Sequence, residues 1–157
     1  PVPFQHTHRL LDITDLSDFP SNYADMIYDS HFIEHNPRSN INHSFKEWHR
    51  VLKPGGFLRF GVPDFDNLIK IYNASDKNVE NIVSQLLGQG DSGYDDHHTI
   101  WNMSYAAKIL REAGFSGEIK NWDPEKVEHH KFKDKTNRVF EIGGRKIPIS
   151  LNIEAFK

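Results

Sequence analysis

The sequence has 157 residues, a formal net charge of −3 and no cysteine. That length suits a single domain with one core, the charge gives no basic footprint for nucleic acid, and the absence of cysteine excludes disulfides and cysteine-ligated zinc. Because no apolar run reaches membrane-spanning length and no signal peptide is recognisable, we expect a cytoplasmic protein without a membrane partner.

Two short apolar runs near the start predict strands, Leu10–Ile13 and Ala24–Tyr28, with a polar connection between them. One residue after the second run comes Ser30–His35, a polar loop rich in titratable groups. Open α/β sheets bind ligands beyond the carboxyl ends of their strands. We therefore expect this loop to border a functional site.

A helix and a further strand follow the loop. Pro37 lies near the predicted start of the helix, and apolar side chains recur on one face at Ile41, Phe45, Trp48 and Leu52. Lys53–Gly56 ends the helix, because proline cannot continue it and glycine accepts the positive φ of the turn. Phe57–Val62 is then predicted as a strand, which a right-handed crossover would place parallel to Ala24–Tyr28.

The second half of the sequence continues the alternation of helices and loops. Helices are predicted on the apolar stripe Phe65, Leu68, Ile69 and Tyr72, and again over Val79–Leu87. The polar, glycine-rich segment Gly88–His98 is a candidate for a mobile lid. Ser104 is expected to cap the next helix and Gly114 to end it.

The last predicted strands are Phe115–Lys120 and Ile149–Phe156. In the second of these, apolar and polar residues alternate. That alternation fits an antiparallel strand, which we expect at the far end of the sheet.

Four segments share a recognisable pattern: Ala24–Tyr28, the pair Glu34-His35, the run Glu47–Gly56 and the strand ending Val62-Pro63-Asp64. In that order they resemble the middle of class I S-adenosylmethionine-dependent methyltransferases. The likeness extends to Leu11–Ile13 with Phe19-Pro20, to the helix ending Glu112–Phe115, and to Ser150–Ala155, which is similar to the last strand of a small-molecule branch. It implies one α/β domain over residues 1–157, with a Rossmann-like sheet, helices on both faces, an antiparallel C-terminal strand and S-adenosylmethionine as cofactor.

One part of the family pattern does not occur in the sequence. The family opens with a strand and a glycine-rich turn that holds the methionine end of the cofactor, whereas no glycine precedes Gly55 here. We therefore expect the N-terminal strands to be missing and the methyltransferase-like domain to be incomplete at its N-terminus. Residues 1–157 alone should then bind the cofactor poorly.

The resemblance also implies where the cofactor binds. Asp12 ends a predicted strand and could accept a hydrogen bond from the adenine amino group, while Ile13 meets the adenine ring. Ser30 and His31 follow the next strand and are expected to contact the cofactor, chiefly through their backbone. The alternatives are a solvated aspartate at position 12 and ordinary turn hydrogen bonding by Ser30.

Methyl transfer from a sulfonium releases a neutral thioether, so the protein mainly positions the reactants and removes a proton from a hydroxyl acceptor. Histidine suits that proton transfer. His98, on the predicted lid, is the first candidate for the base, with an ordinary solvated loop residue as the alternative. His35, at the carboxyl edge of the strand, is the second, provided that it faces the cleft. Asp95–His98 could also ligate a divalent metal, but adjacent residues seldom share one ion, so we predict no metal site.

Three functions are compatible with these patterns. We expect a methyltransferase acting on a small molecule, with an oxygen of a sugar or glycan precursor as the preferred acceptor. A non-catalytic methyltransferase-like binding or assembly module is the second alternative, and a metal-dependent hydrolase the third. The sequence leaves the oligomeric state open.

Overall fold

The computed structural model describes residues 13–90, 95–127 and 134–157. Its strands are β1 (Ala24–Ser30), β2 (Leu52–Pro63), β3 (Ile119–Asn121), β4 (Val139–Ile142), β5 (Arg145–Pro148) and β6 (Ser150–Phe156). Its α-helices are α1 (Ile41–Val51), α2 (Phe65–Ala74), α3 (Val83–Leu87) and α4 (Met103–Ala113). Short 3-10 helices are η1 (Ile33–His35), η2 (Val79–Asn81) and η3 (Lys135–Asn137).

The predicted unit of strand, helix and parallel strand is confirmed as β1, α1 and β2. Ile41, Phe45 and Trp48 are buried, because they fall on the one face of α1 that meets the sheet. The chain passes directly from α1 into β2. A Cβ at Gly56 would lie 2.9 Å from the carbonyl oxygen of Asp25, so glycine permits the close approach of β1 and β2 there.

The main sheet has the strand order β1-β2-β6-β3. β6 runs antiparallel to both β2 and β3, which confirms the predicted antiparallel strand near the C-terminus. Its expected place at the far end of the sheet is wrong, because β6 lies between β2 and β3 and the short strand β3 forms the edge. Consequently even polar residues of β6, such as Ser150 and Glu154, are buried.

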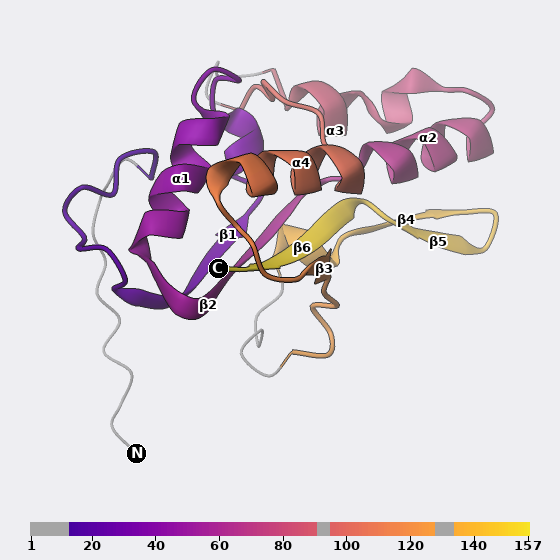
Figure 1. Ribbon diagram of the computed structural model, residues 1–157. Helices are drawn as coiled ribbons and strands as arrows, with labels where there is room; N and C mark the ends of the chain where they lie inside the picture. The colour runs from indigo at the N-terminus through magenta and orange to yellow at the C-terminus, as the bar shows by residue number, and fades with distance from the viewer. Residues whose placement is uncertain (1–12, 91–94, 128–133) are drawn as a thin grey trace.

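Helices and sheet form layers. Helices α1 and α4 lie side by side over one face of the sheet (Figure 1), and the short helix η3 packs against β2 and β6. The α/β architecture with a Rossmann-like sheet is thus confirmed. The main core holds the large buried side chains Phe45, Trp48, Phe60, Trp101 and Phe115.

A second, smaller unit extends from this body. Helix α2 packs against a two-stranded hairpin of β4 and β5, which the sequence analysis did not predict (Figure 1). Gly143 and Gly144 form its turn with φ values of +54° and +74°. Two consecutive residues with positive φ are typical of tight hairpin turns, so this pair of glycines was the available signal.

The buried face of α2 differs from the predicted one. Leu68 and Ile71 are buried, whereas Ile69 is 42% exposed. The hairpin covers the side of α2 that carries Leu68 and Ile71 and leaves Ile69 in contact with solvent. The predicted helix over Val79–Leu87 is divided into η2 and α3. Ile82, between them, supplies the buried contact.

Helix α4 begins two residues earlier than predicted. Asn102, rather than Ser104, is its N-cap, and the Asn102 side chain accepts a hydrogen bond from the backbone N–H of Tyr105. Gly114 ends the helix with a φ of +108°, as predicted.

The predicted strand Leu10–Ile13 is only partly described by the structure. Residues 10–12 of the predicted strand Leu10–Ile13 lie outside the described residues, and Ile13 lies in a turn. In the described ranges, no helix combines the length and apolar character needed to cross a membrane.

Candidate functional site

The backbone turns sharply where β1 ends. Ser30 is the last residue of β1, and His31 adopts a left-handed φ of +56°. The N–H of His31 donates to the carbonyl of Gly61 in β2 at 2.8 Å, so the turn is tied to the neighbouring strand. Left-handed backbone at a residue other than glycine is uncommon and gathers at functional sites. Ser30 and His31, the predicted cofactor residues, therefore lie at the carboxyl ends of the parallel strands.

Two carboxyl groups are buried behind this turn. Asp29 accepts a hydrogen bond from the N–H of Ile33 at 3.3 Å, and Glu34 is fully buried in η1. Burial, together with the nearby Glu34 carboxylate, raises the pKa of Asp29 to about 8. Asp29 was not among the predicted site residues. An acidic residue directly after the predicted strand Ala24–Tyr28 was the signal for it.

The imidazole of His31 lies between Ser150 and Glu34. Its Nε2 is 2.7 Å from Oγ of Ser150, whose hydroxyl donates to the carbonyl of Lys135. Because the Ser150 proton is already used, Nε2 of His31 must be the donor. Nδ1 of His31 faces Oε1 of Glu34 at 3.0 Å. Histidine 31 is thus held in one orientation by β6 and η1.

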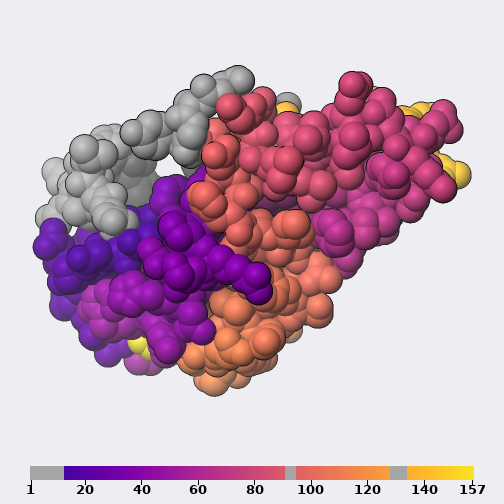
Figure 2. All heavy atoms as spheres, turned by 90° about the horizontal axis from the view of Figure 1, so that it is seen from above, coloured from indigo at the N-terminus to yellow at the C-terminus, as the bar shows by residue number. Residues whose placement is uncertain are grey.

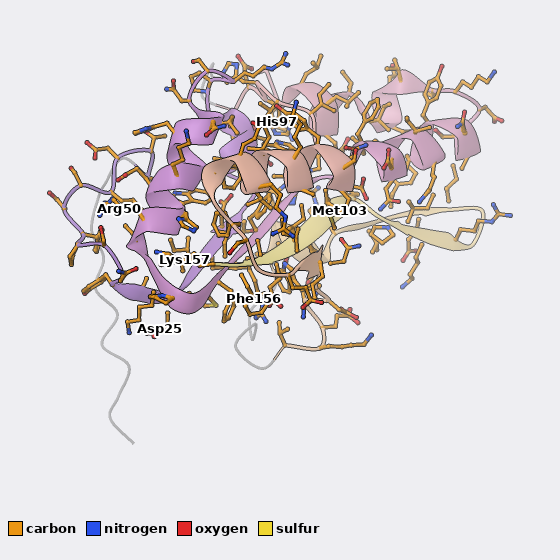
Figure 3. All side chains as sticks on the ribbon, viewed as in Figure 1. Asp25, Arg50, His97, Met103, Phe156 and Lys157 are labelled. Atoms are coloured by element: carbon orange, nitrogen blue, oxygen red, sulfur yellow. The ribbon has the colours of Figure 1, made fainter. Side chains whose placement is uncertain are left out.

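A second pair of imidazoles meets beside Glu34. The rings of His35 and His97 contact edge to face, with centroids 4.7 Å apart. Nδ1 of His35 lies 3.2 Å from the carbonyl oxygen of Asp96, and Nδ1 of His97 lies 2.9 Å from that of Gln85. Burial lowers the pKa of His97. In Figure 3, His97 lies at the upper end of the molecule, close to α3.

His98, the first candidate for a catalytic base, has a different position. Its side chain is exposed, and its backbone N–H donates to the carbonyl of Glu34 at 2.8 Å. This backbone bond directs the preceding residue, His97, rather than His98, toward His35. Of the two predicted bases, the structure therefore places only His35 in the cluster of titratable groups.

The predicted lid and adenine contacts are only partly described. Residues 91–94 of Gly88–His98 and Asp12 lie outside the described residues. The far end of the lid segment is held by backbone bonds from His97 to Leu87 and from His98 to Glu34. Ile13 is half-buried, and its carbonyl accepts a hydrogen bond from the Trp48 indole at 3.1 Å.

Two cavities open near these residues. A small one, of about 30 Å³, is bordered by His31, Asp95 and His97. A larger one, of about 430 Å³, is lined by Trp122 and by the polar side chains Asn121, Asp123, Arg138 and Asn152. Arg138 borders both cavities. Ser150, the partner of His31, also lines the larger one, so the end of β1 adjoins a space large enough for a small molecule.

Comparisons with known proteins agree with this fold. Residues 3–60 match the family described as methyltransferase domain. A search of curated proteins gave no significant match. Among solved structures, the chain resembles an S-adenosylmethionine-dependent methyltransferase from Archaeoglobus fulgidus, with 17% identity and a TM-score of 0.57 over 94% of this chain and 66% of that one.

Similar structures come from two other organisms. A methyltransferase from Methanosarcina mazei has 20% identity and a TM-score of 0.54, over 95% of this chain and 66% of that one. One from Thermotoga maritima has 19% identity and a TM-score of 0.54, over 92% and 61%. The chain thus has the fold of S-adenosylmethionine-dependent methyltransferases, spanning 61% to 66% of the length of these structures.

Proposed function

We propose that this protein transfers a methyl group from S-adenosylmethionine to a small molecule, with an oxygen of a sugar or glycan precursor as the preferred acceptor. A fold alone does not define a function. The observation that carries the proposal is the gathering of Ser30, His31 and Glu34 at the carboxyl end of β1, where open α/β sheets bind their ligands.

The chemistry of these groups fits the cofactor. The sulfonium of S-adenosylmethionine is positively charged, and the fully buried Glu34 carboxyl lies directly behind the turn at His31. The cofactor supplies the reactive methyl carbon, so the task of the protein is to orient donor and acceptor. The left-handed turn at His31 fixes the backbone that we expect to line the cofactor.

The larger cavity is the proposed acceptor site. Its side chains Asn121, Asp123, Arg138 and Asn152 offer hydrogen-bond donors and acceptors, as a hydroxyl-rich molecule requires. Oδ1 of Asn152 is buried and accepts no hydrogen bond from any residue that the structure describes. A buried polar atom of this kind costs stability unless a ligand or water satisfies it, which supports a polar acceptor.

Cofactor binding is the first test. Isothermal titration of S-adenosylmethionine, and of its demethylated product, into the longest natural form of the protein should give a saturable heat. No measurable heat at millimolar ligand contradicts the proposal. Saturable binding without methyl transfer to any hydroxylated acceptor would instead identify a non-catalytic binding module.

The base is tested by substitution. We propose His98 as the base, with His35 as the second candidate, because an oxygen acceptor must lose a proton during transfer. His98→Ala should lower turnover by about 10²–10⁴-fold and leave cofactor affinity unchanged, as expected for loss of a positioned base. His43→Ala, at an exposed histidine of α1, is the matched control and should leave turnover unchanged. If His98→Ala and His35→Ala both stay within about threefold of the parent, neither residue is the base.

A further inference from the structure

Three side chains from two distant segments meet beside the small cavity. Glu34 and His35 belong to η1, and His97 belongs to the segment that leads to α4. Each offers one potential metal-ligand atom, and these atoms all lie within 4.8 Å of one another. Seen from above, the purple segment that contains η1 and the salmon segment around residue 97 adjoin (Figure 2). The fold, rather than sequence proximity, therefore creates the cluster.

Both histidines have the tautomer that a metal site needs. Nδ1 of His35 faces the carbonyl of Asp96, and Nδ1 of His97 faces the carbonyl of Gln85. Since a carbonyl can only accept, each Nδ1 carries the hydrogen and each Nε2 keeps its lone pair. Metal-binding histidines commonly donate their second ring N–H to a backbone carbonyl in this way, which fixes the ring for the ion.

The third residue is an independent indication of a cation. Glu34 is fully buried; Oε2 accepts no hydrogen bond from the described part of the chain, and Oε1 has Nδ1 of His31 at 3.0 Å as its neighbour. Burying a carboxylate without such partners is costly unless a positive charge compensates it. Asp95 adds a further oxygen, with Oδ1 3.8 Å from Nε2 of His35.

We propose that His35, His97 and Glu34 bind a divalent transition-metal ion, with Nε2 of each imidazole and a carboxylate oxygen as ligands and Asp95 as an additional ligand. Two imidazoles with carboxylate oxygen suit zinc, cobalt, manganese and iron in the divalent state better than calcium or magnesium. The proposal concerns metal binding alone and does not depend on methyl transfer. If His35 is a ligand, His98 is left as the only candidate base of the two.

A protonated His31 is the competing explanation for the buried carboxylate, because its Nδ1 lies 3.0 Å from Oε1 of Glu34. That ion pair would neutralise Glu34 without any metal. It does not account for the two imidazoles that turn both Nδ1 atoms toward carbonyls next to the same carboxylate. The experiment must therefore separate a metal site from a simple histidine–glutamate pair.

Cobalt(II) is the probe, since its visible absorption reports the ligands and zinc(II) should displace it. We expect the chelator-treated wild-type chain to bind one cobalt ion with an absorption spectrum of nitrogen and oxygen ligands, and to lose that spectrum when zinc is added. In His97→Asn, cobalt affinity should fall by at least about 10- to 100-fold, the loss that follows removal of a mere hydrogen-bond partner of a ligand. His43→Asn, at an exposed histidine on α1, is the control and should bind like the wild type.

Two results would overturn the proposal: a wild-type chain that binds no cobalt or zinc stoichiometrically, or His97→Asn binding as tightly as His43→Asn. Glu34→Gln provides a second ligand variant, with circular dichroism to confirm that it folds. If Glu34→Gln does not fold, the wild-type titration and His97→Asn still decide the matter. Because binding is measured without cofactor or acceptor, failure here is distinct from failure of the methyl-transfer proposal.

Discussion

Among individual residues, Arg59 and Glu154 form a buried ion pair across β2 and β6. They are directly opposite in the register, and their side chains are 12% and 6% exposed. The Arg59 guanidinium also lies over the Phe57 ring, 4.9 Å from its centroid. A pair of this kind gives little net stability compared with apolar residues, but removal of one partner leaves a buried charge without compensation.

We expect Arg59→Met to lower the free energy of unfolding by about 1–3 kcal/mol, since it leaves the buried Glu154 carboxylate with the half-exposed Lys120 ammonium, 3.6 Å away, as its remaining charged partner. Urea unfolding measures the change. Lys53→Met is the matched control: Lys53 pairs with Asp25 at 2.8 Å, but both are exposed, so its loss should cost about 0–1 kcal/mol. Similar losses in the two variants would show that the Arg59 pair is not effectively buried.

His49 links stability to pH. It packs edge to face on Phe115, and burial together with the nearby Lys157 lowers the pKa of its imidazole. The unfolded chain therefore binds the His49 proton at a higher pH than the folded protein does, so acidification favours unfolding. This contribution to stability is present above the unfolded pKa, and it is lost as the pH falls below about 6.5.

His49→Gln should reduce this dependence, because glutamine does not titrate. We expect the free energy of unfolding of the variant to fall less steeply than that of the wild type between about pH 7 and pH 5. Urea unfolding at several pH values provides the comparison. Parallel pH profiles for the two proteins would mean that His49 has the same proton affinity in the folded and unfolded states.

At the level of elements, helix α4 shows how an N-cap can be misassigned by two residues. Both Asn102 and Ser104 are good N-cap residue types. Asn102 occupies the extended N-cap conformation, whereas Ser104 lies within the helix and donates to Oδ1 of Asn102. The extended backbone of Asn102, directly after the buried Trp101, decides between them.

Asn102→Ala should therefore destabilise the protein by about 0.5–2 kcal/mol, the usual cost of removing an N-cap side chain. Ser104→Ala should change stability by no more than about 0.5 kcal/mol, as for most surface substitutions. Thermal unfolding of both variants tests the assignment. A larger loss for Ser104→Ala than for Asn102→Ala would restore Ser104 as the cap.

Elements were predictable from the sequence where their signals are local. The parallel unit of β1, α1 and β2 follows from apolar spacing, whereas Lys53–Gly56, which was predicted as a turn, is already part of β2. By contrast, the buried stripe of α2 is chosen by the β4–β5 hairpin, about seventy residues later in the chain, so periodicity alone selected Ile69 where the structure buries Ile71.

For the whole molecule, the place of the candidate site was predictable, but its members were only partly so. Ser30 and His31 lie at the expected edge of the sheet. His97 and His98 are neighbours of the same residue type, and a backbone bond to Glu34 from a distant segment decides which one faces inward. A choice of that kind depends on tertiary contacts, which no local pattern contains.

The position of β6 inside the sheet also has a consequence during synthesis on the ribosome. β1, β2 and β3 all leave the ribosome before β6, yet β6 separates β2 from β3. Until it emerges, the free edge of β2 and the apolar faces of α1 and α4 stay open to other nascent chains and to chaperones. Closure then joins residues 95 positions apart, such as Arg59 and Glu154, and contacts of such long range slow folding. The interval before β6 inserts is therefore the period in which this chain is most exposed to misassembly.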